Sequence, residues 1–393
     1  MLNIFYGRES VDHEKFIYSN IDPKGRALII VPDQYTLEAE RRLFKETDAE
    51  ALMDIEVISM SRLGYRLLEE LGGSKRVFID KYGRHMVLSQ VAREQRDKLE
   101  AFRGLETRNS FLEMVNNFIS EMKQYNCGLD ELETIRDRQD PDTYIYRKLK
   151  DMALIYGEYE KKIKGRYTDS EDYIDLFLSK IEESELIRGN HIWIYGFDSF
   201  APKAMAVIGE LMTYAEDVNV VLTCSMDRRG RDGELFELGR LVMRNLVENA
   251  DLRRIEHSEQ AIPLEFEKFT DLDRYAPVKH IEKEIYALPS RPFLGTEGAP
   301  VMVKASNLYN EAENAAGYVL GLIRDEGYRL RDIKIMLNDQ DVRGPIVKRV
   351  FEEYGLDLFS DSGRDVLDNP IIRYVLSVLD VVLKRFDTQS VMA

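Results

Sequence analysis

The sequence predicts an α/β protein in which a parallel sheet carries an all-helical insertion and is followed by the start of a second α/β unit. Three observations support this prediction. Short apolar runs rich in β-branched residues are bounded by turn formers, helical patterns follow most of these runs, and one long central stretch has almost no strand signal. Strands that alternate with helices form parallel sheets, because the helices serve as crossover connections.

Buried strands are expected wherever four to seven apolar residues run together between turn-forming residues. Sheets of this kind bind their ligands at the carboxyl ends of the strands, so the loops after the strands are the first place to look for a site. The predicted strands cover residues 27–31, 55–59, 192–197, 218–223, 301–305 and 333–337.

Residues 76–184 are predicted to form the helical insertion, because apolar residues recur there at steps of three and four. Aromatic residues at this spacing usually belong to a core, although a stripe that stacks on nucleic-acid bases would have the same spacing. One predicted face carries Phe111, Val115, Phe118, Ile119, Met122 and Tyr125, and a second carries Leu149, Met152, Ile155, Tyr156 and Tyr159.

The predicted domains are residues 1–75 with 185–275, the insertion 76–184, and a second α/β unit over 276–393. The second unit follows a charged, irregular stretch and the turn-rich segment 289–295. Its first helix is expected to end at Gly327, and Pro370 is expected to begin the last one. We expect this unit to be truncated and the chain to be a fragment of a longer protein.

Composition restricts the class of protein. With 393 residues, of which 44% are hydrophobic, the chain can bury sizeable cores. A formal net charge of -16 argues against a protein that coats nucleic acid. Residues 75–108 are locally basic, however, with nine Lys or Arg against five Asp or Glu. A solvated helix face accounts for that segment as well as a nucleic-acid contact does.

The two cysteines and the hydropathy pattern indicate a reducing compartment. Cys127 and Cys224 lie far apart, form no CxxC motif, and are most simply small buried residues to which we assign no metal. The N-terminus lacks the layout of a signal peptide, and no run of about 18 apolar residues occurs. We therefore expect a cytoplasmic protein.

The segment 3–14 (NIFYGRESVDHE) places a strand before a loop where a nucleotide-binding domain keeps its phosphate loop. The GxxxxGK[ST] loop needs a second glycine, a lysine for the phosphates and a hydroxyl for magnesium. Counted from Gly7, those places hold Asp12, His13 and Glu14. An acid repels a triphosphate and a neutral histidine cannot replace the lysine charge; one lost contact of this kind costs about 3 kcal/mol. The sequence therefore predicts a degenerate nucleotide site.

Several segments together resemble, in family order, the N-terminal half of AddB, also called RexB, which belongs with the UvrD-like superfamily 1 helicases. The resemblance covers almost the whole chain. It implies a P-loop NTPase (RecA-like) sheet, followed by a truncated second RecA-like domain. Its landmarks are Gly7-Arg8, LIIVPDQYT at 28–36, VISMSRLGYRLL at 57–68, SEDY at 170–173, IWIYGFDSF at 192–200, GYRLRDI at 327–333 and DNPII at 368–372.

This chain departs from the family pattern at two places in the nucleotide site. The family keeps GRxGSGK[ST], of which only Gly7 and Arg8 remain, and it tends to carry a magnesium-binding aspartate where Tyr195 stands. Both losses fit a site that no longer holds Mg-ATP. The family's nuclease domain, with its divalent metal and iron–sulfur cluster, lies farther toward the C-terminus. The resemblance therefore implies a helicase-nuclease but leaves open whether this chain is itself an enzyme, and we expect neither a cofactor nor a catalytic residue in it.

The resemblance also implies contact with single-stranded DNA at loops after the early strands. Hydroxyls and amides at a helix N-terminus bind phosphate, arginine adds charge, and tyrosine offers a stacking plane. Ser59 or Ser61 could instead simply cap a helix, and Tyr65 could be core. The candidate DNA-binding residues are Gln34, Tyr35, Ser59, Ser61, Arg62 and Tyr65.

Three functions remain open at this point. The first is a noncatalytic module that binds or scans single-stranded DNA, possibly at the recombination hotspot called Chi, beside a motor A subunit in double-strand break repair. The second is a working ATPase or helicase, which would need Asp12, His13 and Glu14 to cradle a triphosphate. The third is a scaffold for the A subunit that touches no DNA, and the acidic charge favours it.

Overall fold

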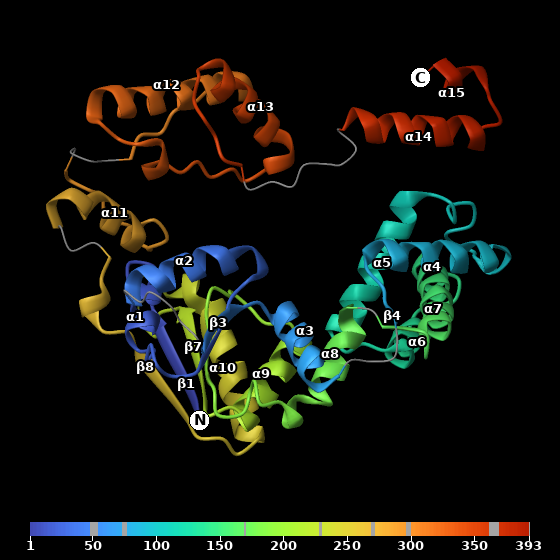
Figure 1. The fold of residues 1–393 in the computed structure, drawn as a ribbon, viewed down its shortest axis with the longest axis horizontal. Coiled ribbons are helices and arrows are strands. Elements are labelled where there is room, and N and C mark those ends of the chain that lie inside the picture. The colour runs from blue at the N-terminus through green and yellow to red at the C-terminus, as the bar shows by residue number, and fades with distance from the viewer. Residues whose placement is uncertain are drawn as a thin grey trace. The chain divides into compact units, whose positions relative to one another are not determined.

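The computed structural model describes residues 1–47, 54–72, 77–168, 170–227, 230–268, 272–295, 300–360 and 369–392 (Figure 1). The chain divides into two compact units, Met1–Ala299 and Pro300–Ala393. The division follows helix α11 (Leu272–Glu284), which lies in the first of these units. The boundary residues Lys75 and Arg76 lie outside the described part, as do Asp368 and the side chains of 170–173.

The first unit contains a six-stranded sheet with the order β3-β2-β6-β7-β1-β8, and every pair in it is parallel. The α/β prediction is confirmed for this unit. Strand β8 was not predicted because its sequence, HSEQA, is polar and lies at the sheet edge. The strands are β1 (Leu2–Gly7), β2 (Ala27–Ile30), β3 (Ile55–Ile58), β6 (His191–Ile194), β7 (Asp217–Thr223) and β8 (His257–Ala261).

Both faces of the sheet are covered, and its central strands are accordingly rich in buried apolar residues. Side chains alternate between the faces, so that Leu28 and Ile30 enter one core while Ile29 and Val31 enter the other. Helices α1 (His13–Ser19) and α2 (Thr36–Thr47) cover one face. The opposite face is covered by α3 (Met60–Leu71), α8 (Ser170–Leu178), α9 (Pro202–Tyr214) and α10 (Glu237–Leu252).

The insertion is helical as predicted and has a core of its own. Its predicted stripes are confirmed as core except at Tyr125, which is 65% exposed: Phe111, Val115 and Ile119 are buried on one helix, and Tyr156 and Tyr159 on another. A short parallel pair, β4 (Val77–Phe78) with β5 (Tyr167–Thr168), joins its two ends. The helices are α4 (Lys81–Glu94), α5 (Asn109–Gln124), α6 (Leu129–Asp137) and α7 (Tyr144–Ile163).

The locally basic segment contributes to this core as well as to the surface. Arg84 is only 5% exposed, and its guanidinium donates to Ser120 Oγ at 2.6 Å. Arg96 lies 3.6 Å from Asp97. Part of the local positive charge is therefore used within the insertion itself.

Asp151 on α7 fastens the chain between α4 and α5. It is completely buried, and its carboxylate accepts hydrogen bonds from the backbone amides of Glu100, Ala101 and Phe102 at 2.8–3.0 Å. Three consecutive amides that have lost water thus share one charged acceptor, a strong form of hydrogen bond. This contact fixes the turn that carries Leu99 and Phe102 into the core.

The second unit consists of helices α12 (Leu308–Glu326), α13 (Gln340–Glu353), α14 (Pro370–Leu383) and α15 (Thr388–Met392). Both predicted helix signals are confirmed: Gly327 ends α12 with a left-handed φ of 74°, and Pro370 occupies the first turn of α14. Ala312, Ala316, Val347 and Phe351 lie in the small core between α12 and α13.

The predicted strands at 301–305 and 333–337 are wrong. Neither segment is a strand, because a strand needs a neighbour for its backbone hydrogen bonds and no described segment pairs with either one. Ile333 and Leu337 instead pack against the α12–α13 core. No strand occurs among the described residues of this unit, so the α/β character expected of it is not seen there.

The remaining elements are short 3₁₀ turns, which connect the longer ones. Among the helices that the structure describes, none is both long enough and apolar enough to cross a membrane. The 3₁₀ turns are η1 (Asp33–Tyr35), η2 (Arg96–Lys98), η3 (Ile181–Glu183), η4 (Gly233–Phe236), η5 (Leu264–Phe266) and η6 (Leu330–Asp332).

The Asp151 contact predicts a specific loss of stability. Asp151→Asn should lower the free energy of unfolding by about 2 kcal/mol, because the amide cannot serve all three buried N–H groups. Urea unfolding followed by circular dichroism measures the loss, and hydrogen exchange should speed up at residues 100–102. Asp142→Asn, at an exposed position, is the matched control. Unchanged exchange at 100–102 would contradict this account.

Candidate functional site

The loop after β1 lies at the carboxyl end of the sheet, and its own side chains cover part of its backbone. Gly7 pairs with Thr223 at the ends of β1 and β7. A Cβ atom on Gly7 would lie 3.2 Å from Nε2 of His13, so the imidazole covers the backbone that a phosphate would have to approach. Asp12 caps α1 by accepting from the backbone amide of Lys15 at 3.1 Å.

A single arginine pairs with both acids of this loop. Arg42, on α2, donates to Asp12 at 2.6 and 2.7 Å and forms an ion pair with Glu14. Glu14 is only 7% exposed, so its charge would be costly without a partner. A bound triphosphate would place its negative charge at this position. Two carboxylates and their cation already occupy it.

Tyrosine hydroxyls complete the environment of Glu14. Its Oε1 accepts from the Tyr35 hydroxyl at 2.7 Å and from the Tyr195 hydroxyl at 3.0 Å. The hydroxyls of Tyr18 and Tyr195 are 2.7 Å apart. Burial raises the pKa of all three phenols, so each stays a neutral hydrogen-bond donor.

Tyr195 directly follows strand β6, at a position where the family pattern leads us to expect a metal-binding acid. The next residue, Gly196, has a φ of 81°, and a Cβ atom there would lie 3.2 Å from the ring of Pro32. Within the described residues, no group of three or more His, Cys, Asp or Glu is arranged to hold a metal ion.

Arg8 turns away from this loop. Its guanidinium donates to Asp232 at 3.0 Å and to Glu282 at 3.2 Å, and it lies 4.9 Å from the ring centre of Phe236. The predicted nucleotide-site residues are therefore close together, but Arg8 is engaged on the other side of the loop.

The site is hollow and predominantly acidic. Its cavity has a volume of about 370 Å³ and contains four carboxylates but only two cations, Arg42 and Lys268. A field of this sign disfavours a nucleotide triphosphate. The carboxylates are those of Glu9, Asp12, Glu14 and Asp198.

The candidate DNA-binding residues lie at the ends of β2 and β3, which pair along the sheet. Gln34 is exposed on η1, directly beside the Tyr35 that Glu14 holds. Ser61 is exposed and donates to Asp33 at 2.6 Å, which links η1 to the start of α3. This link joins the two loops into one surface.

The other candidates differ in how accessible they are. Ser59 is 1% exposed and caps α3 by accepting from the backbone amide of Arg62 at 3.3 Å. The Arg62 side chain is exposed. Tyr65 is 43% exposed and meets the ring of Phe78 edge-on at 5.7 Å. The polar surface consists of Gln34, Ser61, Arg62 and Tyr65, with Ser59 beneath it.

Sequence reasoning missed Arg42 and Tyr18. Both lie on helices whose local pattern is ordinary, in the segments HEKFIYS and TLEAERRLFKET. Their importance comes from contacts made across the sheet face, which no local signal reveals. The pair Asp12 and Glu14 was an indication, because two neighbouring acids, of which Glu14 is buried, require a cation from elsewhere.

The buried histidine predicts a pH effect. Burial lowers the pKa of His13, and Lys268 lowers it further, although Glu9 raises it. In the unfolded chain the His13 imidazole has a pKa near 6.5 and takes up a proton below that pH, whereas the folded chain resists this protonation. The stability that is present above pH 6.5 is therefore lost as the pH falls through 6.5. His13→Gln should lose less stability than the unsubstituted protein between about pH 7.5 and about pH 5.5 in urea unfolding. An equal loss in both proteins would contradict the assignment.

Comparison with known proteins identifies the family. The family model described as "ADDB, N-terminal" matches residues 4–282. The B subunit of the ATP-dependent helicase/deoxyribonuclease of Alkaliphilus metalliredigens is 31% identical over 369 residues, which cover 93% of this chain and 32% of that protein. The protein of the same name from Acetivibrio thermocellus is 28% identical over 397 residues, with coverage of 99% and 35%. The chain spans about a third of the length of these curated relatives. Because the match extends over most of its residues, the chain belongs to the AddB family and corresponds to its N-terminal region.

Proposed function

We propose that this chain is the helicase-like front part of a helicase-nuclease B subunit, which binds single-stranded DNA and pairs with a motor subunit without hydrolysing ATP itself. The observation that carries the proposal is the ion pair of Arg42 with Asp12 and Glu14 inside the former phosphate site. The relatives are named as one subunit of an ATP-dependent helicase/deoxyribonuclease, which supports a partner that supplies the motor.

The strand order supports a RecA-like domain. Strand β1 lies between β7 and β8. The connection from β1 to β2 crosses the sheet toward β3, whereas the connection from β7 to β8 crosses it in the opposite direction. Ligands of open parallel sheets bind where the direction of connection reverses. Here that point is the crevice at the ends of β1 and β7, which the loop with Asp12 and His13 lines.

The charge balance explains why nucleotide would not bind there. A triphosphate would have to displace Arg42 from two carboxylates or lie beside them, and breaking a buried ion pair costs about 3–5 kcal/mol. His13 would also have to leave the backbone of Gly7. Neither cost is offset by a lysine or a magnesium-binding acid in the loop.

A nucleotide titration tests this half of the proposal. Calorimetry with Mg-ATP should show no binding at submillimolar concentration. The triple variant Asp12→Gly, His13→Lys, Glu14→Ser restores the motif GxxxxGKS and should gain measurable affinity, because it removes both acids and adds the phosphate-binding cation. Submillimolar affinity in the unsubstituted chain would overturn the proposal.

The DNA-binding half depends on the surface formed by η1 and the start of α3. An exposed arginine, two hydroxyl or amide side chains and a tyrosine ring suit contact with phosphates and bases. Two hydrogen bonds stabilise this surface. Glu14 accepts one from the Tyr35 hydroxyl, and Asp33 accepts one from Ser61. The loop is thereby ordered before any DNA arrives, which lowers the entropic cost of binding.

Salt dependence separates DNA binding from a purely scaffolding role. The logarithm of the affinity for an oligothymidylate should fall linearly with the logarithm of salt concentration, and Arg62→Gln should reduce the slope by about 0.7. Arg254→Gln is the matched control, because this exposed residue precedes β8 and so lies at the opposite end of the sheet.

A chain with no salt-dependent affinity would instead be a scaffold, which the net charge of -16 favours. An Arg62→Gln variant that keeps the full slope would exclude Arg62 from the DNA-binding surface.

A further inference from the structure

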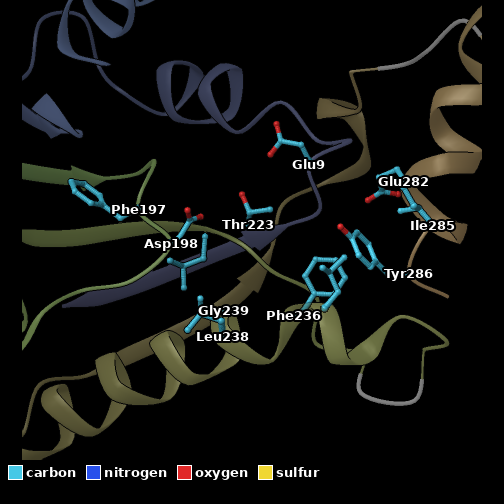
Figure 2. Close-up of a pocket in the computed structure, with 12 residues that line it drawn as sticks. Glu9, Phe197, Asp198, Thr223, Phe236, Leu238, Gly239, Glu282, Ile285 and Tyr286 are labelled. Carbon is cyan, nitrogen blue, oxygen red and sulfur yellow. The ribbon is translucent and has the colours of Figure 1, made fainter. Parts of the chain in front are cut away.

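A second cavity, with a volume of about 420 Å³, lies beside the former nucleotide site in the first unit (Figure 2). It adjoins the acidic cavity, and the two share Glu9, Phe197, Asp198 and Thr223. Its remaining wall comes from η4, the start of α10 and the end of α11. The DNA surface proposed above uses none of these elements.

The cavity wall is mostly apolar and opens to solvent. Figure 2 shows the rings of Phe236 and Tyr286 near Ile285, with Leu238 on the helix below. Tyr286 is 63% exposed, Ile285 64% and Leu238 53%. Adjoining large apolar side chains that remain this exposed are typical of a surface that a partner covers.

Three carboxylates accompany this apolar wall. Glu9 lies 2.8 Å from Lys268 and Glu282 lies 3.2 Å from Arg8, so two of the three have a cation nearby. Asp198 is exposed, and it has no hydrogen bond or ion pair within the described part of the chain. The cavity therefore combines apolar surface with negative charge that is not fully neutralised.

The wall already binds one arginine of this chain in the same manner. The guanidinium of Arg8 lies over Phe236 while it donates to Asp232 and Glu282. Stacking on an aromatic ring together with bonding to carboxylates is the combination that a planar guanidinium satisfies better than an ammonium does.

We propose that this pocket receives an arginine side chain presented by a protein partner. The apolar stem would lie along Leu238 and Ile285, the guanidinium would stack on the rings of Phe236 or Tyr286, and Asp198 would accept its hydrogen bonds. Nucleic acid is disfavoured because its phosphates would meet the carboxylates. The proposal rests on the partner-binding half of the proposed function and is independent of DNA binding.

The test uses N-acetyl-arginine amide as the probe and the whole chain with labelled Leu and Ile methyl groups. Titration in the millimolar range should shift the methyl resonances of Leu222, Leu235, Leu238 and Ile285, which line the cavity. N-acetyl-citrulline amide, which has the same shape without the charge, should leave these resonances in place.

Variants connect the shifts to the carboxylate. Asp198→Asn should weaken binding of the arginine amide about 3-fold, as expected for one exposed charge pair. Asp357→Asn, an exposed acid of the other unit, is the matched control and should leave the affinity unchanged.

Three outcomes would overturn the proposal: no shift at the cavity methyls, equal shifts with citrulline amide, or shifts with deoxyadenosine monophosphate but not with the arginine amide. The last would indicate a nucleotide site instead. Because the probe contains no DNA, failure here leaves the oligothymidylate result untouched, and the two can be distinguished.

Discussion

The ion pair between Arg42 and the two acids Asp12 and Glu14 is the central contact at the carboxyl end of the sheet in the first unit. Glu14 is buried at the carboxyl end of a parallel sheet, where its charge would be intolerable alone. The arginine comes from the helix that follows the next strand, and the phenols of Tyr35 and Tyr195 fill the remaining hydrogen-bonding positions. A place where parallel sheets usually accept a ligand is thereby lined by an ion pair of the protein's own side chains.

The neighbouring contacts fit this ion pair. The hydroxyl of Tyr195, which follows β6, donates to Glu14. The imidazole of His13 lies close to the backbone of Gly7. Arg8 binds Asp232 and Glu282 and so links the loop after β1 to α11 within the first unit. The contacts at this site are therefore mutually consistent.

Much of the first unit could be predicted from sequence, because its signals are local. Apolar runs such as ALII and IEVI favour buried strands, and the steps of three and four on α5 and α7 favour buried helix faces. The acids at 12 and 14 led to the prediction of a degenerate nucleotide site. The cation that pairs with them could not be predicted, since Arg42 approaches them only after the sheet has folded. The failures at 301–305 and 333–337 have a related cause: β-branched residues favour a strand, but only a neighbouring strand can form one.

The hydrogen bond from Tyr35 to Glu14 affects whether the position of Tyr35 can change during an ATP cycle. In a motor domain, side chains near the nucleotide change position as ATP is bound and spent, and the grip on DNA changes with them. Here a permanent carboxylate holds the tyrosine. On the proposed function, the DNA-binding surface of this chain would stay the same at every stage of the ATP cycle of its partner. A surface that does not change suits recognition of DNA sequence better than it suits a motor.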